Sequence, residues 1–207
     1  MATANINDFV SSFNSDLARV CNFEVQLTAP PKLLSAVGNP QLQRFKDLAG
    51  AAKTISPLRC EQAELPPRAF VTVEQKTYGP KEYYPIQNYY NKSAMTFLCS
   101  DNMIEKYFFD LWMDVISGSS PDYEQYNPNS VRFDFEYKNN YKMDVKIMQK
   151  NLTGQNSYVV NLREAFPVEV YGLPLSWAQQ NTIHRLNVVF MYRYFYSETI
   201  QQSITAS

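Results

Sequence analysis

The sequence predicts a mainly β protein with one packed α-helix, in which the strands form an antiparallel β-sandwich or barrel. Apolar and polar residues alternate in several segments, which is the period of a half-buried strand. Aromatic residues make up 14% of the chain, with 15 Tyr and 13 Phe, and these side chains favour strands. Residues 101–116 carry the clearest apolar stripe with helical spacing.

The N-terminal half of the chain is expected to contain four strands. The first covers residues 23–27, where apolar and polar residues alternate. Residues 58–64 and 68–77 are predicted to form a strand pair that is interrupted by two prolines. The apolar run at residues 93–99 predicts a buried strand. The Tyr-rich segment 78–92 contains Gly and Pro and is predicted to be a loop.

One amphipathic helix is predicted after these strands. Ser100 or Asp101 can cap its start, Asp101 and Glu105 suit the positive end of the helix dipole, and Gly118 fits the C-terminal stop. A helix with so broad an apolar stripe must pack on a sheet. The stripe consists of Met103, Ile104, Tyr107, Phe108, Leu111, Trp112, Val115 and Ile116.

The C-terminal half is expected to consist almost entirely of strands. Alternating or apolar segments cover residues 131–136, 143–147, 158–166 and 168–171. A long last strand is predicted over residues 186–196. One face of this last strand carries Leu186, Val188, Phe190, Tyr192, Tyr194 and Tyr196.

The chain is expected to form a single domain over residues 1–207. Three segments fall outside the strand and helix pattern. They are predicted to be an N-terminal arm at residues 1–20, an insertion at 29–56 and a polar C-terminal tail at 197–207.

Composition excludes several functional classes. The formal net charge is −1, whereas a protein that grips a nucleic acid backbone normally has a basic excess. This balance still allows a protein that DNA merely passes. No apolar run approaches the roughly 20 residues of a membrane span. Cys21, Cys60 and Cys99 are far apart and odd in number, so they are expected to be reduced thiols.

The sequence offers little for catalysis or for binding a metal or cofactor. A nucleophile–histidine pair would need His184, the only histidine, which is far more often structural in a β-rich segment. The chain has no motif for a phosphate loop, a hydrolase elbow or a metal site. Asp134 and Glu136 share one face of a predicted strand, where a solvated surface is a better explanation than a glycosidase pair. We expect neither an enzyme nor a bound cofactor.

The tyrosine cluster in residues 78–90 has two possible functions. It could be a platform that stacks nucleic acid bases or sugars. It could equally be a contact surface that a neighbouring subunit covers, which the low number of nearby basic residues favours. The candidate contact residues are Tyr78, Tyr83, Tyr84, Tyr89 and Tyr90.

An ordered set of short motifs resembles the tail tube proteins of contractile-tailed bacteriophages. The resemblance covers roughly residues 20–196, and the Trp-bearing helix and the Leu-Ser-Trp turn are its more specific parts. The motifs are Arg59 to Pro66, Tyr78-Gly79-Pro80 with the Tyr-rich stretch, Met95 to Cys99, Phe108-Phe109 with Trp112 and Ile116, Tyr141 to Met148, Asn161 to Pro167, Leu175-Ser176-Trp177, and Tyr192 with Tyr194-Phe195.

The resemblance implies a structural subunit of the virion tail that is assembled in the host cytoplasm. Family members form hexameric rings, and strands from all subunits complete one larger barrel, so each subunit can leave its sheet edges open. The rings stack inside a contractile sheath, and DNA and the tape measure protein occupy the lumen. Baseplate and tail terminator proteins are the implied partners at the ends. The fold is similar to that of the type VI secretion tube protein.

Two alternatives to the tube subunit stay open. The first is a tube initiator or baseplate hub protein of the same fold, which the long insertion at residues 29–56 suggests. The second is a small β-rich binding module that uses its tyrosine cluster.

The lumen of such a tube is expected to be polar and neutral to acidic. A cationic wall would retain DNA through its phosphates, and stacked rings would multiply each contact. The polar faces of the alternating strands supply candidate lumen residues. These are Glu24, Asp134, Glu136 and Asp144, with Lys146 as a possible counter-charge.

Overall fold

The computed structural model describes residues 18–28, 59–76, 78–117, 135–178 and 182–198. Its strands form a seven-stranded sheet, with the order β1-β6-β7-β8-β5-β2 and β9 paired to β7, and a separate hairpin of β3 and β4. All of these pairings are antiparallel. In chain order the elements are β1 (Phe23–Thr28), β2 (Cys60–Ala63), β3 (Arg68–Gln75), β4 (Glu82–Tyr90), β5 (Ser93–Leu98), α4 (Ile104–Ser117), α5 (Lys138–Tyr141), β6 (Met143–Lys150), β7 (Asn156–Val170), β8 (Arg185–Met191) and β9 (Tyr194–Glu198).

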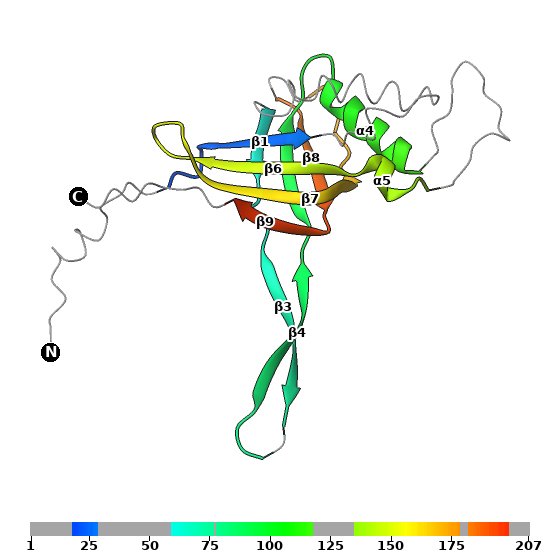
Figure 1. Ribbon diagram of the computed structural model, residues 1–207. Coiled ribbons are helices and arrows are strands. Elements are labelled where there is room, and N and C mark those ends of the chain that lie inside the picture. Colours follow the sequence, from blue (N-terminus) through cyan, green and yellow to red (C-terminus); the bar gives the residue numbers. More distant parts are fainter. Residues whose placement is uncertain (1–17, 29–58, 77, 118–134, 179–181, 199–207) are drawn as a thin grey trace.

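The long strand β7 joins two layers that cross each other. Its first part pairs with β6 and β9, whereas its end, from Phe166 to Val170, pairs with β8. In Figure 1, β1, β6, β7 and β9 lie side by side, and β8, β5 and β2 run across them. The chain bends between the two parts at Glu164, which has φ 56. The result is the antiparallel sandwich that the alternating pattern predicted.

The core lies between the two layers and under α4, the predicted helix. Trp112 is 0% exposed, and its indole Nε1 donates a hydrogen bond to the Tyr141 carbonyl at 2.8 Å. Its ring packs against Phe108, Phe109 and Phe190. Figure 1 shows α4 over one end of the crossed sheets. The prediction that this helix packs on the sheet is therefore confirmed.

The buried side of α4 differs in part from the predicted stripe. Tyr107 is exposed, whereas Phe109 and Glu105 are buried. Glu105 lies in the first turn of α4, at the positive end of the helix dipole as predicted, but its side chain is buried. Its Oε2 accepts bonds from the Ser100 amide and hydroxyl, both at 2.8 Å, and its Oε1 pairs with Arg59. Burial alone would raise the pKa of Glu105, but these hydrogen bonds outweigh it and leave that pKa lowered. Gly118 lies outside the described residues.

The prediction of a loop at residues 78–92 was wrong, because Glu82–Tyr90 form strand β4. Tyrosine has a high strand propensity, and this outweighed the Gly and Pro signals. Gly79 at φ 98 lies in the turn, and Pro85 lies beside the shift in the β3–β4 register, a position that tolerates proline. The expected pairing of the two preceding segments was also wrong: β2 pairs with β5, and β3 pairs with β4.

The predicted long last strand is divided into β8 and β9. The chain passes from one layer to the other at Tyr192 and Arg193, and the Arg193 amide donates to the Arg163 carbonyl at 3.1 Å. The alternation changes phase at this break, so Tyr194 and Tyr196 are exposed and Phe195 is packed against the core.

Two further boundaries differ from expectation. Phe135 and Glu136 lie in an irregular segment before α5 and not in a strand, and the rest of the expected strand at 131–136 is outside the described residues. Ser197 and Glu198 belong to β9 and not to a polar tail. The insertion at 29–56 and most of the N-terminal arm and C-terminal tail also lie outside the described ranges. Within those ranges, no helix has the length and apolar character needed to cross a membrane.

Candidate functional site

The layer of β1, β6, β7 and β9 has one apolar and one charged face. Val25, Val145 and Leu162 point into the core and are fully buried. Residues in the alternate positions face away from the core, as the registers Gln26↔Lys146 and Lys146↔Asn161 require. We call this outer side the charged face. It consists of Glu24, Gln26, Thr28, Asp144, Lys146, Met148, Lys150, Val159, Asn161, Arg163, Tyr194, Tyr196 and Glu198.

Every cation on the charged face has an acidic partner on another strand of the same layer. Lys146 Nζ lies 2.9 and 3.1 Å from the two carboxylate oxygens of Glu198. Lys150 pairs with Glu24, and Arg163 pairs with Asp144. Hydrogen bonds from Lys146 and from Asn161, at 2.9 Å, lower the pKa of Glu198. With three acids and three bases, the face has no net formal charge.

A second cluster of charges fixes the bend of β7 at one end of this face. The Glu164 carboxylate lies 2.8 Å from Lys142 Nζ, 3.1 Å from Lys138 Nζ and 3.5 Å from Arg193. Hydrogen bonds from Lys142 and Lys138 lower the pKa of Glu164 to about 2. The Glu164 amide donates to Asp144 at 3.1 Å. These contacts hold a non-glycine residue in the left-handed region, where its backbone is strained.

The structure brings together two of the four predicted lumen acids and the suggested counter-charge. Glu24, Asp144 and Lys146 share the charged face. Glu136 does not belong to it, because it precedes α5 and its Oε1 accepts from the Asn140 side chain at 2.7 Å. Asp134 lies outside the described residues.

Sequence reasoning missed three charged residues of this face. Lys150 could have been found by extending the alternation of β6 beyond Lys146. Arg163 could have been found in the same way along β7. Glu198 could not, because it was expected to belong to a polar tail and because its partner is 52 residues away.

The β3–β4 hairpin forms a second candidate surface. In Figure 1 it projects from the body of the molecule as a twisted two-stranded ribbon. The register places Val73 beside Tyr84 and Ala69 beside Tyr89 on one of its faces. Large apolar side chains are exposed along the hairpin, namely Phe70, Val71, Val73, Tyr83, Tyr84, Ile86 and Tyr89.

The five candidate contact tyrosines have two different environments. Tyr78, Tyr83, Tyr84 and Tyr89 are exposed on the hairpin and its turn. Tyr90 instead packs inside the subunit at the root of the hairpin. Its ring centroid lies 6.2 Å from that of Tyr192 and 5.7 Å from that of Phe195.

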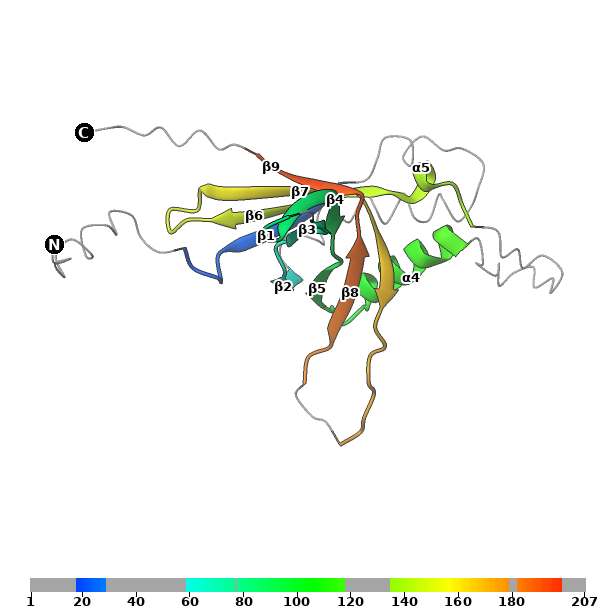
Figure 2. The same ribbon diagram turned by 90° about the horizontal axis from the view of Figure 1, so that it is seen from below.

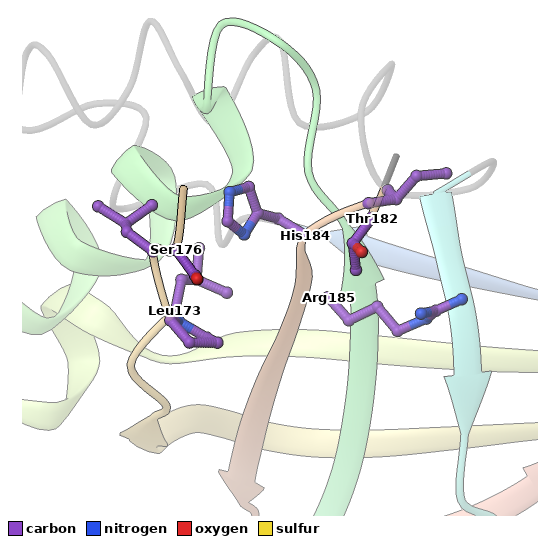
Figure 3. Close-up of a pocket in the computed structure, with 8 residues that line it drawn as sticks. Leu173, Ser176, Thr182, His184 and Arg185 are labelled. Carbon is purple, nitrogen blue, oxygen red and sulfur yellow. The ribbon is translucent and has the colours of Figure 1, made fainter. Parts of the chain in front are cut away.

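His184 lines a cavity of about 270 Å³ between the two limbs of the β7–β8 loop. Figure 3 shows its ring pointing toward the limb that contains Ser176. The Ser176 hydroxyl accepts a bond from the Ala178 amide at 3.3 Å, which is a local turn contact. In the part of the chain that the structure describes, no group of three or more His, Cys, Asp or Glu residues could hold a metal ion.

Comparisons with known proteins identify relatives of the whole described fold. A family model described as phage tail tube protein matches residues 18–198. No curated protein sequence matches the chain.

Three solved structures from contractile injection systems are similar to this chain. A chain of the extended sheath–tube complex of the extracellular contractile injection system PVC has a TM-score of 0.57 and 14% identity, covering 96% of this chain and 100% of its own. A chain of the PVC sheath/tube terminator has a TM-score of 0.57 and 16% identity, covering 89% and 99%. A chain of the anti-feeding prophage baseplate has a TM-score of 0.56 and 12% identity, covering 89% and 97%. At these identities the structural matches establish the fold alone.

Proposed function

The chain belongs to the phage tail tube protein family, and from this we propose that its copies form hexameric rings that stack into the DNA conduit inside a contractile sheath. The family consists of structural tube proteins, so this chain is a structural component of a virion tail and not an enzyme. Assembly from newly made subunits takes place in the host cytoplasm.

The observation that carries the proposal is the layer of β1, β6, β7 and β9. Among the described residues, β1 pairs only with β6 and β9 pairs only with β7, so these two are the outer strands of the layer. Such edges favour pairing with another chain. If β1 of one copy pairs with β9 of the next, the layers continue around a ring and close into one barrel.

The charged face then lines the lumen, and its charge balance suits the passage of DNA. A cation that binds a phosphate releases counterions and gains affinity. Here Lys146, Lys150 and Arg163 are each held by an acid of the same subunit. A neutral wall therefore lets DNA and a tape measure protein move past it without being retained.

The β3–β4 hairpin provides the contact between stacked rings. Its exposed apolar side chains would cost free energy in water, and a two-stranded hairpin alone is only marginally stable. A contact from one ring to the next is heterologous, so it propagates along the tube. The exposed tyrosines Tyr78, Tyr83, Tyr84 and Tyr89 are our candidates for this contact.

Electron microscopy of the purified protein tests the proposal. Long hollow tubes are the expected result for a main tube subunit. Dispersed monomers at high protein concentration would contradict the proposal and favour a small binding module.

A tube initiator or terminator is the second candidate function. The PVC terminator and anti-feeding prophage baseplate chains match this fold with TM-scores of 0.57 and 0.56. The sheath–tube chain has a TM-score of 0.57, so the fold comparison does not favour one of the three. Single rings that do not stack by themselves would support this candidate. In either case the sheath, the baseplate and the terminator are the neighbours that we propose.

A further inference from the structure

The loop between β7 and β8 exposes apolar side chains that neither the charged face nor the hairpin explains. Trp177 is 102% exposed and Leu175 is 84% exposed. Tyr171 and Ile183 are exposed on the same loop. A tryptophan and a leucine exposed on one loop indicate a surface that another molecule covers.

The space between the limbs of this loop suits an apolar group. Leu173, Pro174, Leu175 and Ile183 line the cavity of about 270 Å³ together with Ser176, Thr182, His184 and Arg185. The Arg185 guanidinium is already occupied, because Nε lies 2.6 Å and an Nη 3.1 Å from the Glu61 carboxylate. The cavity therefore has no free strong charge from Arg185 to attract an anion.

The direction of the loop restricts what can cover it. Figure 2 shows its limbs extending to the side of the molecule opposite the layer of β1, β6, β7 and β9. The hairpin projects in another direction, as Figure 1 shows. If the charged face lines the lumen, lateral neighbours meet at the strand edges and stacked rings meet at the hairpin. The loop then points away from the tube axis, where the enclosing sheath lies.

We propose that the β7–β8 loop is the docking site for a sheath subunit, with Leu175 and Trp177 as its anchors. An apolar side chain of the sheath protein enters the cavity between the two limbs. This inference rests on the proposed function, because it needs the charged face to be on the lumen side.

A binding experiment with assembled tubes tests the docking site. Tubes of the wild type, of Trp177→Ala and of Leu175→Ser are mixed with the sheath protein of the same particle, and bound sheath is measured by co-sedimentation and electron microscopy. We expect Trp177→Ala to form normal tubes that bind sheath at least about 30-fold more weakly, as for an interface hot spot. Leu152→Ala is the matched control, because Leu152 is 47% exposed in the turn between β6 and β7.

Fluorescence gives a second, direct readout, because the chain has only two tryptophans, one buried and one exposed. The Trp177 emission is the difference between the spectra of wild-type and Trp177→Phe tubes. When sheath binds, this emission should shift to shorter wavelength and be quenched less by acrylamide.

The possible outcomes separate the two proposals. Variants that bind sheath as well as the wild type does would overturn the docking site and leave the tube function in place. Wild-type tubes that bind no sheath protein would overturn the docking site and the enclosing sheath, but not the stacked tube. A folded Trp177→Ala protein that forms no tubes would overturn it too, because the loop would then join copies of this chain. A wild-type protein that assembles into neither rings nor tubes would overturn both proposals.

Discussion

The two tryptophans occupy opposite environments and predict opposite effects of substitution. Trp112 is fully buried between α4 and β8 and donates a bond to Tyr141, whereas Trp177 is fully exposed. Trp112→Ala leaves a cavity and removes a hydrogen bond, so we expect it to lower the free energy of unfolding by about 3–5 kcal/mol. Trp177→Ala should change it by less than about 0.5 kcal/mol. Chemical denaturation of both variants checks this, and unchanged stability of Trp112→Ala would refute the predicted core.

Glu164 predicts a pH-dependent contribution to stability. Its pKa falls from an ordinary value of 4.5 to about 2 in the folded chain, because Lys142 and Lys138 bind its charged form. A carboxylate with a lowered folded pKa stabilises fully above pH 4.5, and this contribution is lost as the pH falls toward 2. We expect Glu164→Gln to cost about 1–3 kcal/mol at pH 7 and close to nothing at the acid end of this range.

Urea denaturation at several pH values measures this difference between Glu164→Gln and the wild type. Glu169→Gln is the control, because Glu169 lies on the same strand and is exposed. Glu164→Gly also removes the carboxylate but tolerates the positive φ, so it should be more stable than Glu164→Gln by about 1 kcal/mol. A difference between Glu164→Gln and the wild type that does not change with pH would contradict the assigned ion pairs.

The hairpin of β3 and β4 is the element whose role is best tested by assembly. Removing residues 81–90 would delete all of β4, including Tyr90, which packs at the root of the hairpin. Val73→Ser with Tyr84→Ser is a cleaner change, because these two exposed residues lie opposite each other on one face. We expect a folded, soluble subunit with unchanged thermal unfolding that no longer forms tubes.

Asn88→Ser is the matched control for the hairpin, since it changes a polar residue of the same strand. It should form tubes of normal length, visible by electron microscopy. Normal tubes from the Val73 and Tyr84 double variant would show that this face does not join rings.

Charge balance on the charged face is a property of the whole assembly. Glu24→Gln with Glu198→Gln removes the acids that hold Lys150 and Lys146, and it leaves two unpaired cations on each copy. Stacked rings repeat these cations along the wall, so we expect tubes that bind double-stranded DNA at low salt and particles that eject DNA more slowly. The added affinity should fall steeply as salt rises, because it arises from counterion release.

The opposite change, Lys146→Gln with Lys150→Gln, is the control and should bind DNA no better than the wild type. DNA binding to purified tubes and ejection rates from particles are the two measurements. Ejection that is equally fast for the acid-deficient tubes at low salt would exclude a role of the charged face in DNA passage.

Local patterns determined much of this molecule without any tertiary information. Val25 and Leu27, and likewise Met143 and Val145, alternate with polar residues. This pattern predicted two strands and the buried side of each, and the structure confirms them. The apolar stripe predicted α4 and the burial of Trp112. These predictions succeeded because one face of each element is buried. The apolar residues therefore recur with the period of a strand or helix, which can be read from residues that are close in the sequence.

Tertiary structure alone decided how these elements are combined. It paired β3 with β4 and β2 with β5, divided the last strand at Arg193 and bent β7 at Glu164. It also paired Glu24 with Lys150 across 126 residues and Lys146 with Glu198 across 52 residues. An alternating pattern shows which side chains share a face of one strand, but it does not show which strand lies next to it. The pairing of each cation on the charged face with an acid depends on which strands are neighbours. Only the folded sheet could therefore reveal that this face has no net charge.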